Sequence, residues 1–336
     1  MNKSDKEFFA PDFSHIYVEE EALKYDVTKD IMNRFSGAVT VPIHHYKDVF
    51  NRTHQNFFLQ KQSTSLILAV KHGELIYPGA GVCQSFGNEH FYYTSNVMNC
   101  IFDCEYCYLQ GMYPSGNMVI FVNQEDIFRE TDRLLAEHSV YLCVSYDTDL
   151  LAIEDITGFV AKWTDFAASR PSLKIEIRTK SAYTKGFEHF SQAKNIIFAW
   201  TLSPEEVIAE YEHKTPNLDA RIKALSCAIA NGYTTRLCFD PMLRIKDYQK
   251  IYSKMFRKVF KSINADKILD ISIGTFRISA DYLKNMRKQR LGKITSYPYS
   301  NISGVSGYES VLVKEMLDFA ESEIRKYTTD TGIYRT

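Results

Sequence analysis

The sequence lacks the features that mark membrane, secreted or repetitive proteins. No segment approaches the roughly 20 apolar residues that a membrane-spanning helix needs. The first residues, MNKSDKEFFAPDF, contain no apolar core of a secretion signal. We also find no internal repeat and no low-complexity tract. We therefore expect a cytoplasmic globular protein with no membrane partner.

A large excess of positive charge is also missing. The 336 residues include 40 Lys and Arg against 41 Asp and Glu, so the net charge is −1. This balance excludes the broadly basic surface of many nucleic-acid-binding proteins, and a polyanion would have to be held by a local patch. Tyr and Phe number 22 each, which suits either core packing or stacking on bases.

Segments with the apolar, β-rich character of strands alternate with amphipathic helical segments over the second two thirds of the chain. This alternation predicts βαβ units and a parallel sheet, because parallel strands need a crossover connection. Six or seven such units suit a barrel or partial barrel. The predicted strands are His90–Thr94, Met118–Val122, Val140–Ser145, Leu173–Arg178, Asn195–Thr201, Thr235–Phe239 and Ile268–Ile273. The predicted helices are Glu125–His138, Ile156–Ala168, Glu205–Tyr211, Leu218–Asn231, Asp247–Ser262 and Ala280–Gln289.

The chain divides into three predicted parts. Residues 1–88, with a strand at Ser65–Val70, form an N-terminal extension packed on the barrel. Residues 89–280 form the barrel itself. Residues 281–336 form a C-terminal segment that faces the substrate, with a Gly- and Ser-rich turn at Asn301–Gly307 before a last helix, Ser310–Tyr327.

Three of the seven cysteines lie within eight residues, at Cys100, Cys104 and Cys107. The odd, uneven set of cysteines argues against a disulfide framework. Three thiolates can bind three irons of a [4Fe–4S] cluster and leave the fourth iron open. An open iron can chelate S-adenosylmethionine (SAM), whose reductive cleavage gives a 5′-deoxyadenosyl radical. The alternatives are a zinc site, which would need a further ligand pair that the sequence lacks, and three structural cysteines.

The residues around this triplet resemble the spore photoproduct lyase family of radical SAM enzymes. The resemblance covers nearly the whole chain. It includes Tyr106 and Tyr108 on either side of Cys107, Leu109-Gln110, and the stretches 20–25 (EEALKY), 121–128 (FVNQEDIF) and 148–157 (TDLLAIEDIT).

The resemblance implies an α/β fold, a partial (β/α)6 TIM-like barrel of the radical SAM type with N- and C-terminal extensions. It also implies a carbon–carbon lyase that repairs DNA. The radical takes hydrogen from C6 of the methylene-bridged thymine dimer, the spore photoproduct, which then separates into two thymines. The partners implied are DNA containing this lesion and an electron donor such as flavodoxin or ferredoxin. Tyr106 and Tyr108 match tyrosines that relay the radical back to SAM.

One position departs from the family. The hydrogen-donor cysteine of better-known members stands three residues before the Asp that matches Asp149, where this chain has Tyr146. Tyr146 itself could be the donor, or Cys83 in the Gly-rich segment Gly79–Gly87, or Cys143. Side chains alternate along a strand, so residues 143 and 146 should face opposite sides, which argues against Cys143. We interpret Cys143 as a buried, small apolar residue. The remaining alternative is a radical SAM enzyme of the same family that acts on a different substrate.

Polar residues after the predicted strands are candidates for binding SAM, since barrels carry their functional groups at the carboxyl ends of strands. These are Thr148, Asp149, Lys180 and Ser203. The resemblance implies a lesion flipped out of the duplex into the barrel mouth. A basic run from Lys284 to Lys293 precedes two tyrosines, and it is either a DNA-binding patch or a solvated helix face. The DNA-binding candidates are Arg290, Lys293, Tyr297 and Tyr299.

Overall fold

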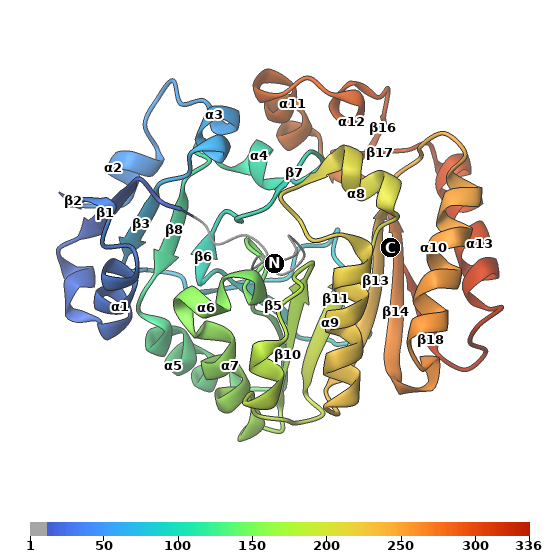
Figure 1. Ribbon diagram of the computed structural model, residues 1–336, viewed down its shortest axis with the longest axis horizontal. Helices are drawn as coiled ribbons and strands as arrows, with labels where there is room; N and C mark the ends of the chain where they lie inside the picture. Colours follow the sequence, from blue (N-terminus) through green and yellow to red (C-terminus); the bar gives the residue numbers. More distant parts are fainter. Residues whose placement is uncertain (1–11) are drawn as a thin grey trace, which may run out of the picture.

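Eight strands form the largest sheet of the computed structural model, which describes residues 12–336 (Figure 1). Six of them are parallel and adjacent in chain order, each pair joined by a crossover. These six are β5 (Phe91–Thr94), β9 (Val140–Cys143), β10 (Leu173–Thr179), β11 (Ile196–Thr201), β13 (Thr234–Met242) and β14 (Ile268–Thr275). At the two edges lie β4 (Ile76–Pro78), antiparallel to β5, and β18 (Gly332–Arg335), parallel to β14.

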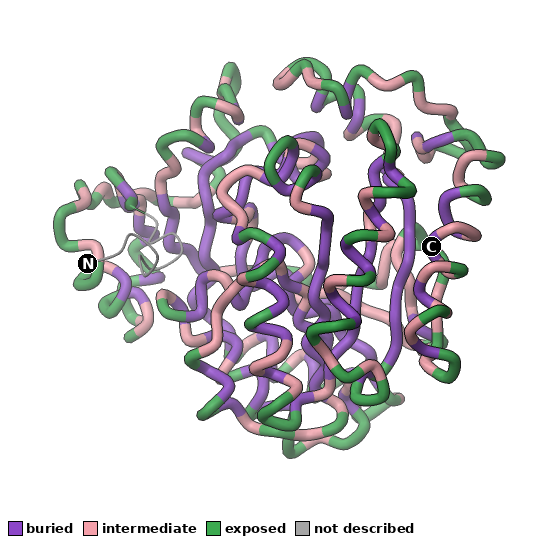
Figure 2. Tube along the Cα trace, turned by 45° about the vertical axis from the view of Figure 1, so that its right-hand side comes forward, coloured by how far each residue is buried: buried purple, intermediate pink, exposed green. Residues whose placement is uncertain are grey.

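The sheet is curved but not closed, since its edge strands β4 and β18 do not pair. This confirms the predicted partial barrel. All residues of β9 and β11 are buried, as expected of strands covered on both sides. Helices run along the outside and turn their exposed residues to solvent (Figure 2). They are α5 (Gln124–Leu135), α7 (Phe159–Ala168), α8 (Glu205–Tyr211), α9 (Leu218–Ala230), α10 (Tyr248–Ser262) and α13 (Ser310–Ile324).

A second sheet of five strands, in the order β2–β1–β3–β8–β6, lies beside the barrel (Figure 1). Its strands are β1 (His15–Glu19), β2 (Val39–Ile43), β3 (Leu66–Ala69), β6 (Val97–Met98) and β8 (Met118–Phe121). The strand predicted at 118–122 forms here and pairs with β3 rather than with a barrel strand. An apolar strand pattern specifies burial on both faces and does not specify the partner strand.

Short elements complete the N-terminal third and the first half of the barrel. They are η1 (Glu21–Lys24), α1 (Asp26–Arg34), α2 (Lys47–Phe50), α3 (Phe57–Gln62), β7 (Asp103–Cys104), α4 (Leu109–Met112), η2 (Leu151–Ile153), α6 (Glu154–Thr157), η3 (Lys185–Glu188) and β12 (Glu212–His213). The helix predicted at 156–168 is divided between α6 and α7. Gly158 separates them with φ +62°, a conformation that favours glycine.

The C-terminal part builds a cap over one end of the molecule. It contains α11 (Ala280–Gln289), α12 (Lys293–Ser296) and a three-stranded sheet of β15 (Arg277–Ser279), β17 (Val305–Gly307) and β16 (Ser300–Ile302). The short η4 (Ala265–Lys267) lies outside this cap and leads into β14. The turn predicted at 301–307 is the β16–β17 hairpin. In the described part of the chain no helix has both the length and the apolar character to cross a bilayer.

Candidate active site

The three clustered cysteines lie on one loop between β6 and α4, and backbone contacts fix that loop. β7, which contains Cys104, pairs with β12 across the barrel opening. The Lys61 ammonium donates a hydrogen bond to the Cys100 carbonyl. The Gln110 side chain donates one of 2.7 Å to the Cys104 carbonyl, and the Cys107 amide donates another of 3.1 Å to the same oxygen. These bonds hold the carbonyls of the loop and leave the thiols available.

The loop environment fits an iron–sulfur cluster. Burial raises the pKa of the Cys100 thiol to about 11 and raises those of Cys104 and Cys107, so the thiols stay protonated until a metal displaces the protons. Within residues 12–336 no three His, Cys, Asp or Glu side chains are placed to share a single metal ion. A cubane does not require this, because each thiolate binds a different iron. Three soft thiolate donors suit iron–sulfur ligation.

A buried carboxylate, Glu212, organises one side of the site. It accepts hydrogen bonds from the hydroxyls of Tyr106 and Ser203, the latter at 2.7 Å, and pairs with the fully buried Arg221. Burial opposes ionisation, but the charges of Arg221 and Lys180 lower the pKa of Glu212 to about 2. The sequence patterns did not point to Glu212 or Arg221. Ser203, predicted to bind SAM, has its hydroxyl turned toward this carboxylate.

The other predicted SAM-binding residues lie at the carboxyl ends of β9 and β10. Asp149 accepts hydrogen bonds from the Lys180 amide (2.6 Å), the Thr179 hydroxyl (2.7 Å) and the Ala152 amide (3.1 Å), so it fixes the loop backbone. The Thr148 hydroxyl is buried and has no hydrogen-bond partner among the described residues. Burial acts to lower the pKa of Lys180, but the adjacent Cys104 and Glu212 raise it. An unpartnered hydroxyl and a cation beside the cysteines are groups that a polar, carboxylate-bearing cofactor can use.

Cys83 and Tyr146, two of the three candidate hydrogen donors, are in contact. The Cys83 Sγ lies 3.6 Å from the Tyr146 hydroxyl oxygen. The Tyr146 ring stacks on Tyr93, with centroids 4.0 Å apart, and lies 5.9 Å from the ring of Tyr108. The Tyr108 hydroxyl donates a 2.7 Å hydrogen bond to the Tyr146 carbonyl. A thiol and two phenols therefore form a continuous path that ends at the residue next to Cys107.

Asp147 holds one tyrosine of this path, Tyr108, through a hydrogen bond. It is buried and accepts hydrogen bonds from the hydroxyls of Tyr113 (2.9 Å), Tyr108 (3.2 Å) and Ser95. The Tyr108 hydroxyl is therefore held by two groups, the Asp147 carboxylate and the Tyr146 carbonyl. Asp147 was not among the predicted site residues, although it directly precedes the stretch 148–157 that resembles the family.

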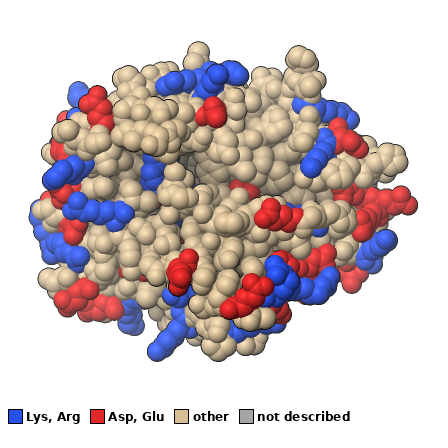
Figure 3. Space-filling model, turned by 180° about the vertical axis from the view of Figure 1, so that it is seen from behind, with Lys and Arg blue, Asp and Glu red and all other residues tan. Residues whose placement is uncertain are grey.

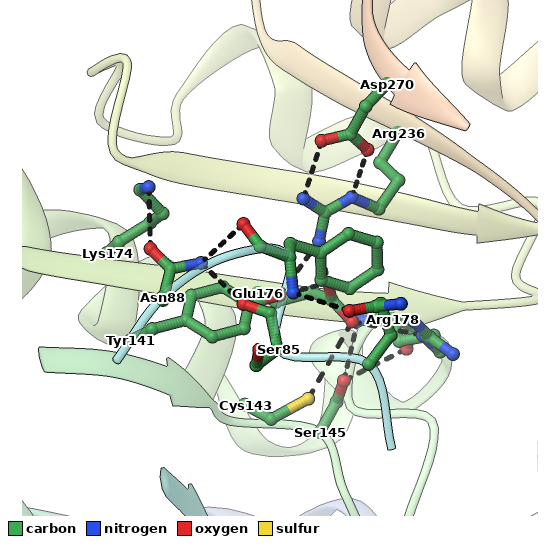
Figure 4. A network of polar contacts seen from close by, with 12 residues as sticks. Ser85, Asn88, Tyr141, Cys143, Ser145, Lys174, Glu176, Arg178, Arg236 and Asp270 are labelled. Atoms are coloured by element: carbon green, nitrogen blue, oxygen red, sulfur yellow. Dashed lines mark hydrogen bonds and ion pairs between the residues drawn. The ribbon is translucent and has the colours of Figure 1, made fainter. Parts of the chain in front are cut away.

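Cys143 faces a separate polar network inside the barrel (Figure 4). Its thiol is buried and donates to Glu176 at 3.8 Å. Glu176 pairs with Arg236, which also binds Asp270 through two nitrogens. β9 ends at Cys143, so side-chain alternation does not relate positions 143 and 146 as expected from the sequence. The contact of Cys143 with Glu176 ties it to this network.

The predicted DNA-binding residues lie on the C-terminal cap, and most have partners within the protein. Arg290 pairs with Asp103 (3.1 Å) and Glu105 (3.3 Å), and only 14% of its side chain is exposed. Lys293 pairs with Glu210 at 2.5 Å. Tyr297 and Tyr299 pack together with centroids 4.8 Å apart. On the face in Figure 3, Lys and Arg alternate with Asp and Glu around the rim, and that face shows no continuous basic surface.

Comparison with known proteins shows the family of this chain. The family model described as spore photoproduct lyase matches residues 9–302. The chain belongs to the spore photoproduct lyase family. A spore photoproduct lyase of Clostridium acetobutylicum is 24% identical over 280 residues, which are 80% of this chain and 79% of that protein. The enzyme of Bacillus subtilis (strain 168) is 21% identical over 272 residues, 76% of this chain and 75% of its own.

A solved structure confirms the fold of the family for this chain. The spore photoproduct lyase complexed with dinucleoside spore photoproduct matches 98% of this chain and 100% of its own, with a TM-score of 0.83 and 18% identity. The likeness covers the N-terminal sheet and the C-terminal cap as well as the partial barrel. The family's radical SAM fold, predicted from the cysteine loop and the strand–helix alternation, is thereby confirmed.

Proposed function

We propose that this protein is a radical SAM lyase that splits the methylene-bridged thymine dimer of DNA into two thymines. Family membership and the shared fold support the reaction class. The observation that carries the proposal to this chain is the contact between Cys83 and Tyr146. The family's donor position holds Tyr146, and the fold brings a thiol to that tyrosine from a different segment. The absence of a cysteine at position 146 had favoured a different substrate. Cys83 supplies a thiol next to that position.

Cys100, Cys104 and Cys107 would hold the [4Fe–4S] cluster, with Lys180 and Thr148 available to SAM. When bound, these cofactors supply the 5′-deoxyadenosyl radical that removes hydrogen from C6 of the lesion. The site residues then close the reaction. Burial raises the pKa of the Tyr108 and Tyr146 hydroxyls, so both phenols stay neutral and can each give up a hydrogen atom rather than a proton alone.

In the proposed sequence, Cys83 gives the hydrogen atom of its S–H bond to the thymine radical left after the methylene bridge breaks. The second thymine is thereby completed and a sulfur-centred radical remains on Cys83. Tyr146 restores the S–H bond by giving the hydrogen atom of its hydroxyl. Tyr108 does the same for Tyr146, which moves the radical toward the cluster loop. Electrons and hydrogen atoms balance at each transfer, because one bond to hydrogen forms as one breaks.

The experiment supplies the reconstituted, reduced protein with SAM and a dinucleotide spore photoproduct. A flavodoxin or ferredoxin is the proposed physiological electron donor, and a chemical reductant replaces it in the assay. We expect 5′-deoxyadenosine and a thymine-type product. 5′-Deoxyadenosine without thymine would retire the repair assignment, and the absence of both products would retire the radical SAM assignment.

A further inference from the structure

The segment that carries Cys83 is tied to the barrel one residue before the cysteine. The Arg277 Nε donates a 3.1 Å hydrogen bond to the carbonyl of Val82. The Cys83 amide in turn donates to the Ala80 carbonyl at 2.9 Å, which makes a turn of residues 80–83. A bond at Val82 therefore acts on the backbone from which the thiol projects.

Arg277 is itself fixed on its other side. Its two terminal nitrogens bind the carboxylate of Asp240 at 2.8 and 3.2 Å, and one also donates to the Thr275 carbonyl at 3.1 Å. A Cβ atom at Gly274 would lie 2.5 Å from an Asp240 oxygen and 2.9 Å from an Arg277 nitrogen. Only glycine at position 274 leaves room for this pair. A bidentate arginine–carboxylate pair holds both side chains in a defined orientation.

Arg277 also begins the C-terminal cap. It is the first residue of β15, which pairs with β17, and Arg277 stands opposite Gly307 in that register. The hairpin of β16 and β17 belongs to the segment predicted to face the substrate. One side chain thus links the cap, the carboxyl end of β13 and the Cys83 segment.

We propose that Arg277 is a positioning residue for the Cys83 thiol, holding it at Tyr146 and in reach of the substrate through the Val82 carbonyl. This inference rests on the proposed function for the role of Cys83. The segment is also held beyond the cysteine: Gln84 donates a hydrogen bond to the Arg335 carbonyl at 3.2 Å, and the Phe86 ring covers the Arg236 guanidinium at 3.2 Å. These act on the far side of Cys83, so the loss of Arg277 frees the thiol without detaching the whole segment.

The test is Arg277→Met in the full-length, cluster-loaded protein. Three quantities are measured: 5′-deoxyadenosine formed, the fraction of opened lesion that becomes thymine rather than a trapped adduct, and the alkylation rate of Cys83 by peptide mass spectrometry. We expect 5′-deoxyadenosine to form still, the thymine fraction to fall severalfold, and Cys83 to be alkylated faster. Unchanged thymine fraction and unchanged alkylation would overturn the proposal.

The matched control is Arg170→Met. Arg170 binds Asp132 through two nitrogens (2.6 and 2.9 Å) and a backbone carbonyl at 2.9 Å, as Arg277 does, but on the outer surface near the start of β10. It should leave both readouts at the wild-type level. If Arg277→Met does not fold, Arg277→Lys keeps a charge beside Asp240 but cannot form the three-way contact, and the same shifts are expected. Failure of the wild type to make thymine would retire the proposed function, while the alkylation rate would still decide the role of Arg277.

Discussion

The thiol of Cys83 lies 3.6 Å from the hydroxyl of Tyr146, although 63 residues separate them in the chain. The resemblance to the family places Tyr146 at the position of the donor cysteine of better-known members, and Cys83 comes from the segment between β4 and β5. The stacked ring of Tyr93 fixes Tyr146 from one face. The proposed donor thiol therefore comes from a different segment of the chain but lies in contact with Tyr146.

Replacing the thiol should separate the start of the reaction from its end. In Cys83→Ala we expect 5′-deoxyadenosine formation to continue and the yield of thymine to fall on the order of tenfold or more, with trapped adducts taking its place. Product analysis by chromatography and mass spectrometry measures this. Cys227→Ala, which removes a half-buried thiol on the outer helix α9, should behave as wild type. Clean repair by Cys83→Ala would show that another group donates.

Removing the hydroxyl of Tyr146 should affect recycling rather than donation. Tyr146→Phe keeps the stacking on Tyr93 but removes the partner of Cys83. We expect thymine in the first turnover and then a loss of rate on the order of tenfold, with more SAM consumed per thymine. Single-turnover and steady-state assays of the same preparation separate the two. If Tyr146 were the direct donor, the first turnover would already fail.

The cluster should depend on each of the three loop cysteines. In Cys104→Ala we expect no [4Fe–4S] cluster after reconstitution and no 5′-deoxyadenosine, because two thiolates cannot hold three irons of the cubane. Iron and sulfide content and the visible spectrum measure the loading. Cys238→Ala removes another buried thiol, from β13, and should load as the wild type does. Equal loading of both variants would contradict the assignment of Cys104.

The Glu212–Arg221 pair should stabilise the protein in a pH-dependent way. The pKa of Glu212 lies near 2, below its ordinary value of 4.5, so the ionised carboxylate stabilises the fold above pH 4.5 and that contribution is lost as pH falls toward 2. Glu212→Gln leaves the buried Arg221 uncompensated and should cost about 3–5 kcal/mol of unfolding free energy at pH 7. The loss should shrink in acid. Denaturant unfolding at several pH values measures it.

An exposed ion pair provides the control for that variant. Glu210 pairs with Lys293 at the surface, and such pairs contribute about 0–1 kcal/mol. Glu210→Gln should therefore change the unfolding free energy little at any pH. A Glu212→Gln variant as stable as Glu210→Gln at neutral pH would mean that the buried pair is not ionised.

Much of the fold was predictable because the barrel strands are short apolar runs and amphipathic helices follow several of them, as α7 follows β9 and α10 follows β13. The strand at 140–145, for example, is β9 with its end two residues early. The partner of β8 was not predictable, since an apolar strand carries no information on which sheet it joins. The division into parts at residues 88 and 280 stays a prediction, and residues 1–11 of the first part lie outside the described structure.

The cysteine loop was the clearest signal of the site because its three ligands are local in sequence. Site residues that come together from distant segments left weaker signals in the sequence. Cys83 was one of several candidate thiols until the fold placed it at Tyr146. Glu212 and Asp147 were not predicted at all. The sequence does indicate buried polar networks, because charged residues such as Glu176 and Arg236 stand within apolar strands.

The most direct test of the account is the source of the hydrogen atom in the repaired thymine. The reaction is run in deuterium oxide with unlabelled SAM and lesion, and the product is analysed by mass spectrometry for the wild type and for Cys83→Ala. A thiol exchanges its hydrogen with solvent. We predict that wild-type thymine carries one deuterium and that Cys83→Ala forms little deuterated thymine. Thymine without deuterium from the wild type, or deuterated thymine at an undiminished rate from Cys83→Ala, would contradict Cys83 as the donor.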